Sequence, residues 1–82
     1  MAANEVRYDE GADALYVQLN DLPAAKTTPV DDLRLIDYSA DGRVVGVEFL
    51  QVSGGIDLSA LPFMHRIEEL IRDRGFDIRI LA

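Results

Sequence analysis

The stretch that decides the fold of this chain is LRLIDYSADGRVVGVEFLQV, residues 33–52. Apolar and polar residues alternate on both sides of Asp41-Gly42, a dipeptide typical of the turn in a β-hairpin. A three-residue loop, Ala40-Asp41-Gly42, puts the glycine where the backbone needs a positive φ. The stretch therefore predicts two antiparallel strands joined by a tight turn.

This loop also predicts a strand register, in which Leu35 lies opposite Val47. The same register pairs Leu33 with Phe49 on that face, and Tyr38 with Val44, Ile36 with Gly46 and Arg34 with Glu48 on the other face. Apolar residues then meet apolar ones, and the one cation meets the one anion, which favours this register over a shift by one residue. Gly46 within a strand indicates a bulge or another group packed close to the backbone.

Three further strands are expected before the hairpin, at residues 5–8, 14–19 and 26–30. Each has β-branched, aromatic or alternating apolar residues, and turn-forming residues separate the strands. The third strand contains Pro29, which has no N–H to donate, so it is expected at an edge of the sheet.

One helix and a last strand are expected after Val52. Ser59 caps the helix, Pro62 lies in its first turn, and Gly75 ends it. Its apolar residues fall on one arc: Phe63, Met64, Ile67, Leu70 and Ile71. The alternation of Phe76, Ile78 and Ile80 with Asp77, Arg79 and Leu81 predicts a strand that returns to the sheet.

These elements predict an α+β fold. It is an antiparallel β-meander sheet of about five to six strands with one C-terminal helix packed on one face. Residues 1–82 are expected to form a single domain, with 5–52 as the β-hairpin core and 53–82 as the helix and final strand extension.

The face of the sheet without a helix is expected to keep apolar side chains. These are Tyr16, Ile36, Tyr38, Val44 and Leu50. A sheet that is apolar on both faces, with one helix to cover it, leaves a patch exposed. We expect this patch, or a free sheet edge, to form a homodimer interface; the alternative is a tolerated scatter of apolar side chains.

Composition narrows the classes of function. The chain has 82 residues and no cysteine, so neither disulfides nor a thiolate metal site is expected. Its formal net charge is −7, and residues 1–52 hold ten acids against four bases. An acidic hairpin region disfavours direct nucleic-acid binding and suits a basic protein partner, although acidic residues also simply keep small proteins soluble.

Membrane association and export are not expected. No apolar run approaches the ~20 residues of a membrane span, and the start of the chain, MAANEVRY, has no apolar signal-peptide core. The protein is therefore expected in the cytoplasm.

Two segments carry a resemblance to a known family. YDEGADALYV, residues 8–17, resembles the opening motif of the domain-of-unknown-function 2283 family, and DYSADGRVVGVE, residues 37–48, is similar to its closing segment. The departures are Gly11 and Ser39, where the family favours acids, and Phe49, where it favours an aliphatic residue. The resemblance covers residues 5–52.

The resemblance implies no activity. It implies a small protein encoded beside a companion, in some cases in a layout similar to toxin–antitoxin pairs. An antitoxin-like role with a small basic partner is thus a hypothesis for this chain.

Four carboxylates are candidates for acid–base catalysis or for oxygen ligation of Mg²⁺ or Ca²⁺: Asp13, Asp37, Asp41 and Glu48. Structural roles are favoured for Asp13 and Asp41 in turns and for Glu48 as the partner of Arg34. Asp37 is the exception, expected on the helix-covered side near the end of the hairpin. His65 is expected on the exposed side of the helix.

Three readings remain. The favoured one is a non-enzymatic, homodimeric interaction module without a cofactor. Its candidate surface residues are Asp13, Tyr16, Ile36, Asp37, Tyr38, Val44 and Glu48. The alternatives are a small-molecule or divalent-metal-binding domain, and an enzyme that uses Asp37 and Glu48.

Overall fold

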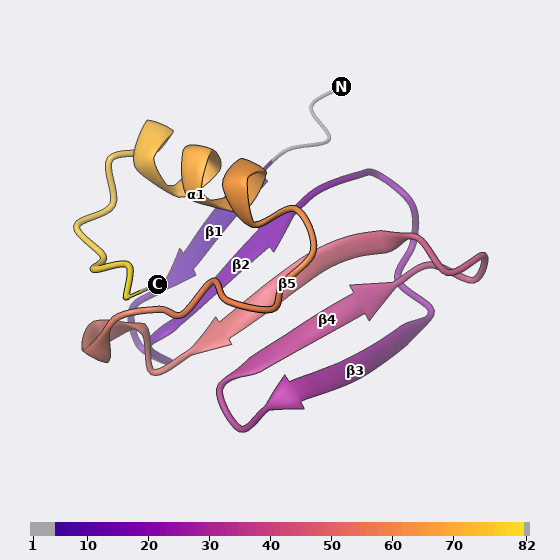
Figure 1. Cartoon of the computed structure of the whole chain (residues 1–82), viewed down its shortest axis with the longest axis horizontal. Helices are drawn as coiled ribbons and strands as arrows, with labels where there is room; N and C mark the ends of the chain where they lie inside the picture. The colour runs from indigo at the N-terminus through magenta and orange to yellow at the C-terminus, as the bar shows by residue number, and fades with distance from the viewer. Residues whose placement is uncertain (1–4, 82) are drawn as a thin grey trace.

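A five-stranded antiparallel sheet and one helix form the structure, a computed structural model that describes residues 5–81 (Figure 1). The strands are β1 (Glu5–Asp9), β2 (Ala14–Gln18), β3 (Lys26–Asp31), β4 (Arg34–Tyr38) and β5 (Val44–Leu50). Their order across the sheet is β1-β2-β5-β4-β3. The predicted α+β fold is confirmed, with residues 19–25 carrying the chain from β2 to the far edge.

The turn of the β4–β5 hairpin follows the prediction. Gly42 has a φ of 87°, and its N–H donates to the carbonyl of Ser39 at 3.0 Å. Ser39 in turn donates its N–H to the carbonyl of Arg43, and the next pair is Tyr38 with Val44. The local chemistry of the turn therefore fixes the start of the register.

Beyond the turn, the predicted register is wrong by one residue. The pairing changes between Tyr38–Val44 and Asp37–Gly46, so Val45 is an extra residue in β5. Leu35 consequently lies opposite Glu48 rather than Val47. A single extra residue moves every later side chain of one strand to the opposite face relative to its partner.

The bulge exchanges the two faces of β4. Ile36, expected on the uncovered face, is only 5% exposed in the core, whereas Leu33, expected in the core, is 40% exposed. Arg34, 8% exposed, lies on the helix side with Phe49, so its predicted ion pair with Glu48 is wrong.

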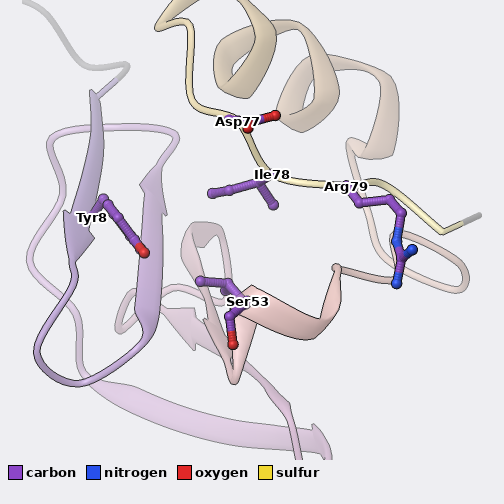
Figure 2. A pocket seen from close by; sticks show the side chains of 6 residues that line it. Tyr8, Ser53, Asp77, Ile78 and Arg79 are labelled. Atoms are coloured by element: carbon purple, nitrogen blue, oxygen red, sulfur yellow. The ribbon is translucent and has the colours of Figure 1, made fainter.

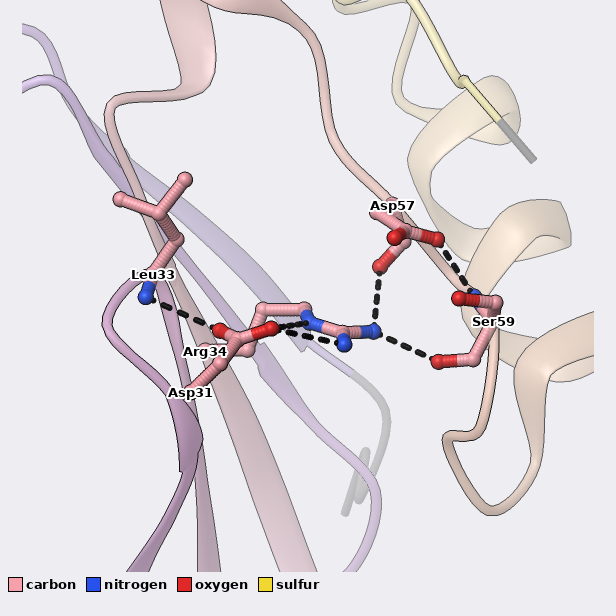
Figure 3. Close-up of polar contacts among 5 residues, drawn as sticks. All are labelled: Asp31, Leu33, Arg34, Asp57 and Ser59. Carbon is pink, nitrogen blue, oxygen red and sulfur yellow. Dashed lines mark hydrogen bonds and ion pairs between the residues drawn. The ribbon is translucent and has the colours of Figure 1, made fainter.

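Arg34 instead ties the sheet to the segment that precedes the helix (Figure 3). Its Nε and Nη2 donate to Oδ2 of Asp31 at 3.0 and 2.8 Å. Its Nη1 donates to the backbone carbonyls of Asp57 and Ser59 at 3.0 and 2.6 Å. A guanidinium buried with four such bonds has its charge and donors largely satisfied.

The core lies between the sheet and a layer formed by residues 52–73. This layer contains a short 3₁₀ helix, η1 (Val52–Gly54), and the helix α1 (Met64–Asp73), which contacts β1 and β2. Its core residues include Val52, Ile56, Leu58, Leu61, Ile67, Leu70 and Ile71, and the sheet contributes Val6, Leu15, Val17, Ile36, Val47 and Phe49.

The helix begins later than expected. Ser59 does not cap it; α1 begins at Met64, after Phe63 with a φ of 58°. The N–H of Ser59 donates to the Asp57 carboxylate, and Ala60 has a φ of 61°, so a helix cannot pass through this segment. Gly75, with a φ of 74°, follows the helix as predicted.

The predicted last strand does not join the sheet. Residues 76–80 make one parallel bridge, between Ile80 and Ile56, and the ring of Phe76 meets the edge of the Tyr8 ring at 5.6 Å. The segment packs against the helix-side layer because its half-buried residues complete the core there. The prediction of a last strand is therefore wrong, although the alternation correctly separates the half-buried residues from the exposed ones.

Candidate functional site: the uncovered face of the sheet

The face of the sheet opposite α1 carries polar side chains on all five strands. The register puts Arg7 of β1, Tyr16 of β2 and Glu48 of β5 side by side, and Gly46 of β5 beside Asp37 of β4 and Thr27 of β3. Directly paired residues project from the same face of a sheet, so these groups share one surface. We refer to it as the uncovered face.

A hydrogen-bond network lies at its centre. The hydroxyl of Tyr16 donates to Oδ2 of Asp37 at 2.9 Å, and the hydroxyl of Thr27 donates to Oδ1 at 2.5 Å. The phenol therefore reaches from β2 across β5 to β4. The carboxylate of Asp37 on β4 therefore accepts one hydrogen bond from each side, from Tyr16 and from Thr27.

Gly46 makes this crossing possible. A Cβ atom at this position would lie 2.3 Å from the Tyr16 hydroxyl oxygen, 2.5 Å from its Cζ and 2.8 Å from the carbonyl oxygen of Val17. Real side chains do not approach so closely, so the Tyr16 ring lies where only glycine leaves space. Both readings of Gly46, a bulge nearby and a closely packed group, are confirmed.

Tyr16 is held as a protonated donor. Burial raises the pKa of its phenol far above the ordinary value, and the hydrogen bond to Asp37 raises that pKa further. The guanidinium of Arg7 lies 5.1 Å from the centre of the ring and opposes this shift in pKa only in part. A phenol in this state suits binding and positioning rather than proton abstraction.

Glu48 is the carboxylate that the uncovered face leaves without a partner. It is half-buried on the central strand, between Tyr16 and Leu35 on the neighbouring strands. Among residues 5–81, its carboxylate accepts no hydrogen bond and forms no ion pair, because Arg34 lies on the opposite face. A half-hidden negative charge beside an aromatic ring and a leucine is well placed for a cation from outside the chain.

The uncovered face is acidic as a whole. Its charged side chains are Glu5, Arg7, Asp9, Asp37 and Glu48, which gives four acids and one base. The single base is shared, because Arg7 also contacts Glu5 at 3.2 Å. This surface therefore favours positively charged groups.

The structure divides the candidate residues proposed from the sequence between the two faces of the sheet. It brings Tyr16, Asp37 and Glu48 together, although Asp37 was expected on the helix-covered side. Ile36, Tyr38 and Val44 lie on the helix side, with Ile36 buried and the other two partly buried against the core. Tyr16 and Leu50 remain on the uncovered face, and the bulge adds Leu35 to it, so the apolar surface there has partly different members. A homodimer through this face stays a prediction.

Asp13 has a structural position away from this face. Its carboxylate accepts hydrogen bonds from the N–H and the hydroxyl of Ser53 at 2.9 and 2.7 Å, joining the β1–β2 turn to η1. Asp41 lies in the hairpin turn and pairs with Arg43 at 3.1 Å. The hydrogen bond from Ser39 keeps the pKa of Asp41 below its usual value.

Three residues of the network, Arg7, Thr27 and Gly46, were not among the candidates. A signal for Gly46 existed, because a glycine inside a strand indicates a bulge or a group packed close to the backbone. No signal in the sequence connected Thr27 to Asp37, since their contact depends on strand order.

A separate hollow of about 650 Å³ lies on the helix side (Figure 2). It is lined by Tyr8, Val52, Ser53, Asp77, Ile78 and Arg79. Tyr8 and Ile78 face each other across it, while the Ser53 hydroxyl is already bonded to Asp13. Within residues 5–81, no group of three or more His, Asp or Glu side chains is arranged to hold a metal ion.

Comparison with known protein families identifies a match. The sequence model of a family described as "Protein of unknown function (DUF2283)" matches residues 5–53, which include all five strands. No curated protein and no solved structure matches the chain. In the part of the chain that the structure describes, no helix is long and apolar enough to cross a membrane.

Proposed function

The chain belongs to the DUF2283 family, whose function is unassigned, and on this premise we propose that it is a non-enzymatic interaction module whose uncovered face binds a basic protein. The observation that carries the proposal is Glu48, an unpaired, half-buried carboxylate at the centre of an acidic face. The partner that we name is a small basic protein encoded beside this chain, as in a toxin–antitoxin pair.

The surroundings of Glu48 define the group that it accepts. An arginine or lysine side chain reaching Glu48 would lay its methylene stem over Leu35 and Tyr16, which flank the carboxylate. Arginine fits better because its planar guanidinium can bind the carboxylate through two hydrogen bonds and stack on the tyrosine ring.

Binding, rather than catalysis, agrees with the state of the neighbouring groups. Tyr16 keeps its proton, and both oxygens of Asp37 accept hydrogen bonds from hydroxyls within the network. These groups are already ordered before a partner arrives, which lowers the entropy cost of association.

A defined peptide tests the proposal. Binding of a fluorescent hexaarginine peptide is measured by anisotropy with the full chain and with two matched variants, Glu48→Gln and Glu10→Gln. Glu10 is an exposed acid in the β1–β2 turn, so both substitutions remove one negative charge. Loss of the Glu48 contact should weaken binding about tenfold, or about 1.4 kcal/mol, since charged anchor residues dominate interfaces.

The Glu10 variant should show only the small general effect of lower net charge, and added salt should weaken all three interactions. Equal weakening by the two variants would mean that the peptide responds to overall charge. That result would overturn the proposed role of the uncovered face.

A further inference from the structure

The burial of the tail segment, residues 76–80, alternates as in an extended chain, and the segment has almost no backbone partners. Phe76, Ile78 and Ile80 are half-buried, while Asp77 and Arg79 between them are exposed. Its pairing is limited to Ile56, whose N–H donates to the carbonyl of Arg79 at 2.8 Å and whose carbonyl accepts the N–H of Leu81 at 2.7 Å. These bonds form the start of a parallel ladder that extends no further.

One edge of the tail segment is therefore free. In an extended chain, the backbone polar groups of successive residues point to opposite sides. Because the bonded groups of Arg79 and Leu81 face Ile56, those of Phe76, Ile78 and Ile80 face away from it. Within residues 5–81, these three residues form no backbone hydrogen bond across that edge. Unpaired edges of this kind bind another strand readily.

The sequence of the tail segment is complementary to itself. If two copies pair antiparallel with Ile78 opposite Ile78, Asp77 of each copy lies opposite Arg79 of the other. Phe76 then lies opposite Ile80, so the charged pairs are on the exposed face and the apolar pairs on the buried face. Opposite charges and matched apolar side chains at facing positions are the pairs that stabilise antiparallel strands.

We propose that the tail segments of two chains pair in this way, forming a symmetric homodimer. The free backbone groups belong to residues 76, 78 and 80, and these are the groups that pairing centred on Ile78 requires. The two-fold symmetry makes each Asp77–Arg79 contact occur twice. Leu81, 56% exposed next to the tail segment, would also be covered.

A second copy of this chain is favoured over an unrelated partner because of the order of Asp77 and Arg79 in the tail segment. A strand with one acid and one base two residues apart matches its own reversed sequence, whereas a uniformly basic strand would face Arg79 with a like charge. The inference does not depend on Glu48, since the tail segment lies on the helix side of the sheet.

Charge exchange tests the proposal on the full chain. Sedimentation equilibrium gives the dimer dissociation constant for the natural sequence, for Asp77→Arg, for Arg79→Asp and for the double variant. Each single change places like charges opposite one another twice and should raise the dissociation constant about tenfold or more. The double variant reverses both pairs and should restore dimerisation.

Asp73→Arg is the matched control, because it makes the same charge change on an exposed residue of α1 outside the tail segment. It should leave the dissociation constant nearly unchanged. A chain that stays monomeric at the concentrations of NMR spectroscopy would overturn the proposal. So would a dimer that persists in both single variants, or a folded double variant that does not dimerise.

Amide exchange adds an independent readout. In the dimer, the amides of Phe76, Ile78 and Ile80 should exchange more slowly than in a dilute, monomeric sample, whereas the amide of Asp77 should not change. Protection elsewhere without this alternation would assign dimerisation to another surface and overturn the proposal.

Discussion

Replacing Gly46 with alanine is the sharpest structural test of the network on the uncovered face. The added methyl group would overlap the phenol of Tyr16, with separations of 2.3 and 2.5 Å, and would also press on the carbonyl oxygen of Val17 at 2.8 Å. The tyrosine must then leave its position, and its hydrogen bond to Asp37 is lost.

The magnitude follows from these two effects. Forcing extra volume into a packed site costs about 1–3 kcal/mol. Loss of a hydrogen bond to a charged group adds about 1 kcal/mol once the partial exposure of this site is considered. We therefore expect Gly46→Ala to lower the free energy of unfolding by about 2–4 kcal/mol, a large share of the stability of so small a domain.

Urea denaturation followed by circular dichroism measures this change. Gly54→Ala is the matched control, because a Cβ atom at Gly54 would meet no atom within 4 Å. A double-mutant cycle with Tyr16→Ala isolates the overlap, since the cost of Gly46→Ala should fall markedly once the ring is absent. The reasoning fails if Gly46→Ala is as harmless as Gly54→Ala, or if its cost is the same with and without the ring.

Three further predictions follow from the polar contacts. Arg34→Met should lower the free energy of unfolding, measured by urea denaturation, by about 3 kcal/mol, because two backbone carbonyls and Asp31 lose their donor. A decrease smaller than that of the exposed Arg72→Met variant would contradict this role. Asp31 and Asp57 have pKa values below 3.8 in the folded chain, owing first to hydrogen bonds from Arg34 and Ser59 respectively. The stability that these two carboxylates contribute is present above their unfolded pKa and is lost as the pH falls through their folded pKa. The urea concentration at the midpoint of unfolding should therefore decrease as the pH is lowered below about 4. This decrease should be less steep in Asp31→Asn. The raised pKa of Tyr16 gives the opposite dependence of stability on pH: its contribution is present below the unfolded pKa of 10.0 and declines as the pH rises above it. The variant Tyr16→Phe should lose stability less steeply at alkaline pH.

The parts of the fold that local chemistry determines were predictable. Asp41-Gly42 gave the turn and its first pair, Gly75 gave the end of the helix, and apolar spacing gave the residues with which α1 packs. Each of these signals lies within a few residues of the structure it specifies.

The register beyond the turn depends on a feature that the sequence does not locate. Val44 and Val45 are both apolar, so either can be the extra residue of a bulge, and the choice exchanges the faces of Ile36 and Leu35. Arg34 illustrates the same limit. The alternating pattern predicts Glu48 as its cross-strand partner. Its actual partners include backbone carbonyls more than 20 residues away in the sequence, and no pattern of side chains predicts such contacts.

The candidate site was predictable in its members but not in its geometry. Tyr16, Asp37 and Glu48 were all singled out, yet the network arises because β2 lies beside β5 rather than beside β3. Strand order is a tertiary property, and it decides which residues meet across Gly46.

The central claim, that the uncovered face is the docking surface, is tested most directly by mapping amide chemical shifts of the labelled protein during titration with hexaarginine. The account predicts that the largest changes cluster on β2, β5 and β4 around Tyr16, Glu48 and Leu35, with little change on α1. Changes centred on the helix, or spread evenly over the acidic turns at Asp32 and Asp41, would contradict it.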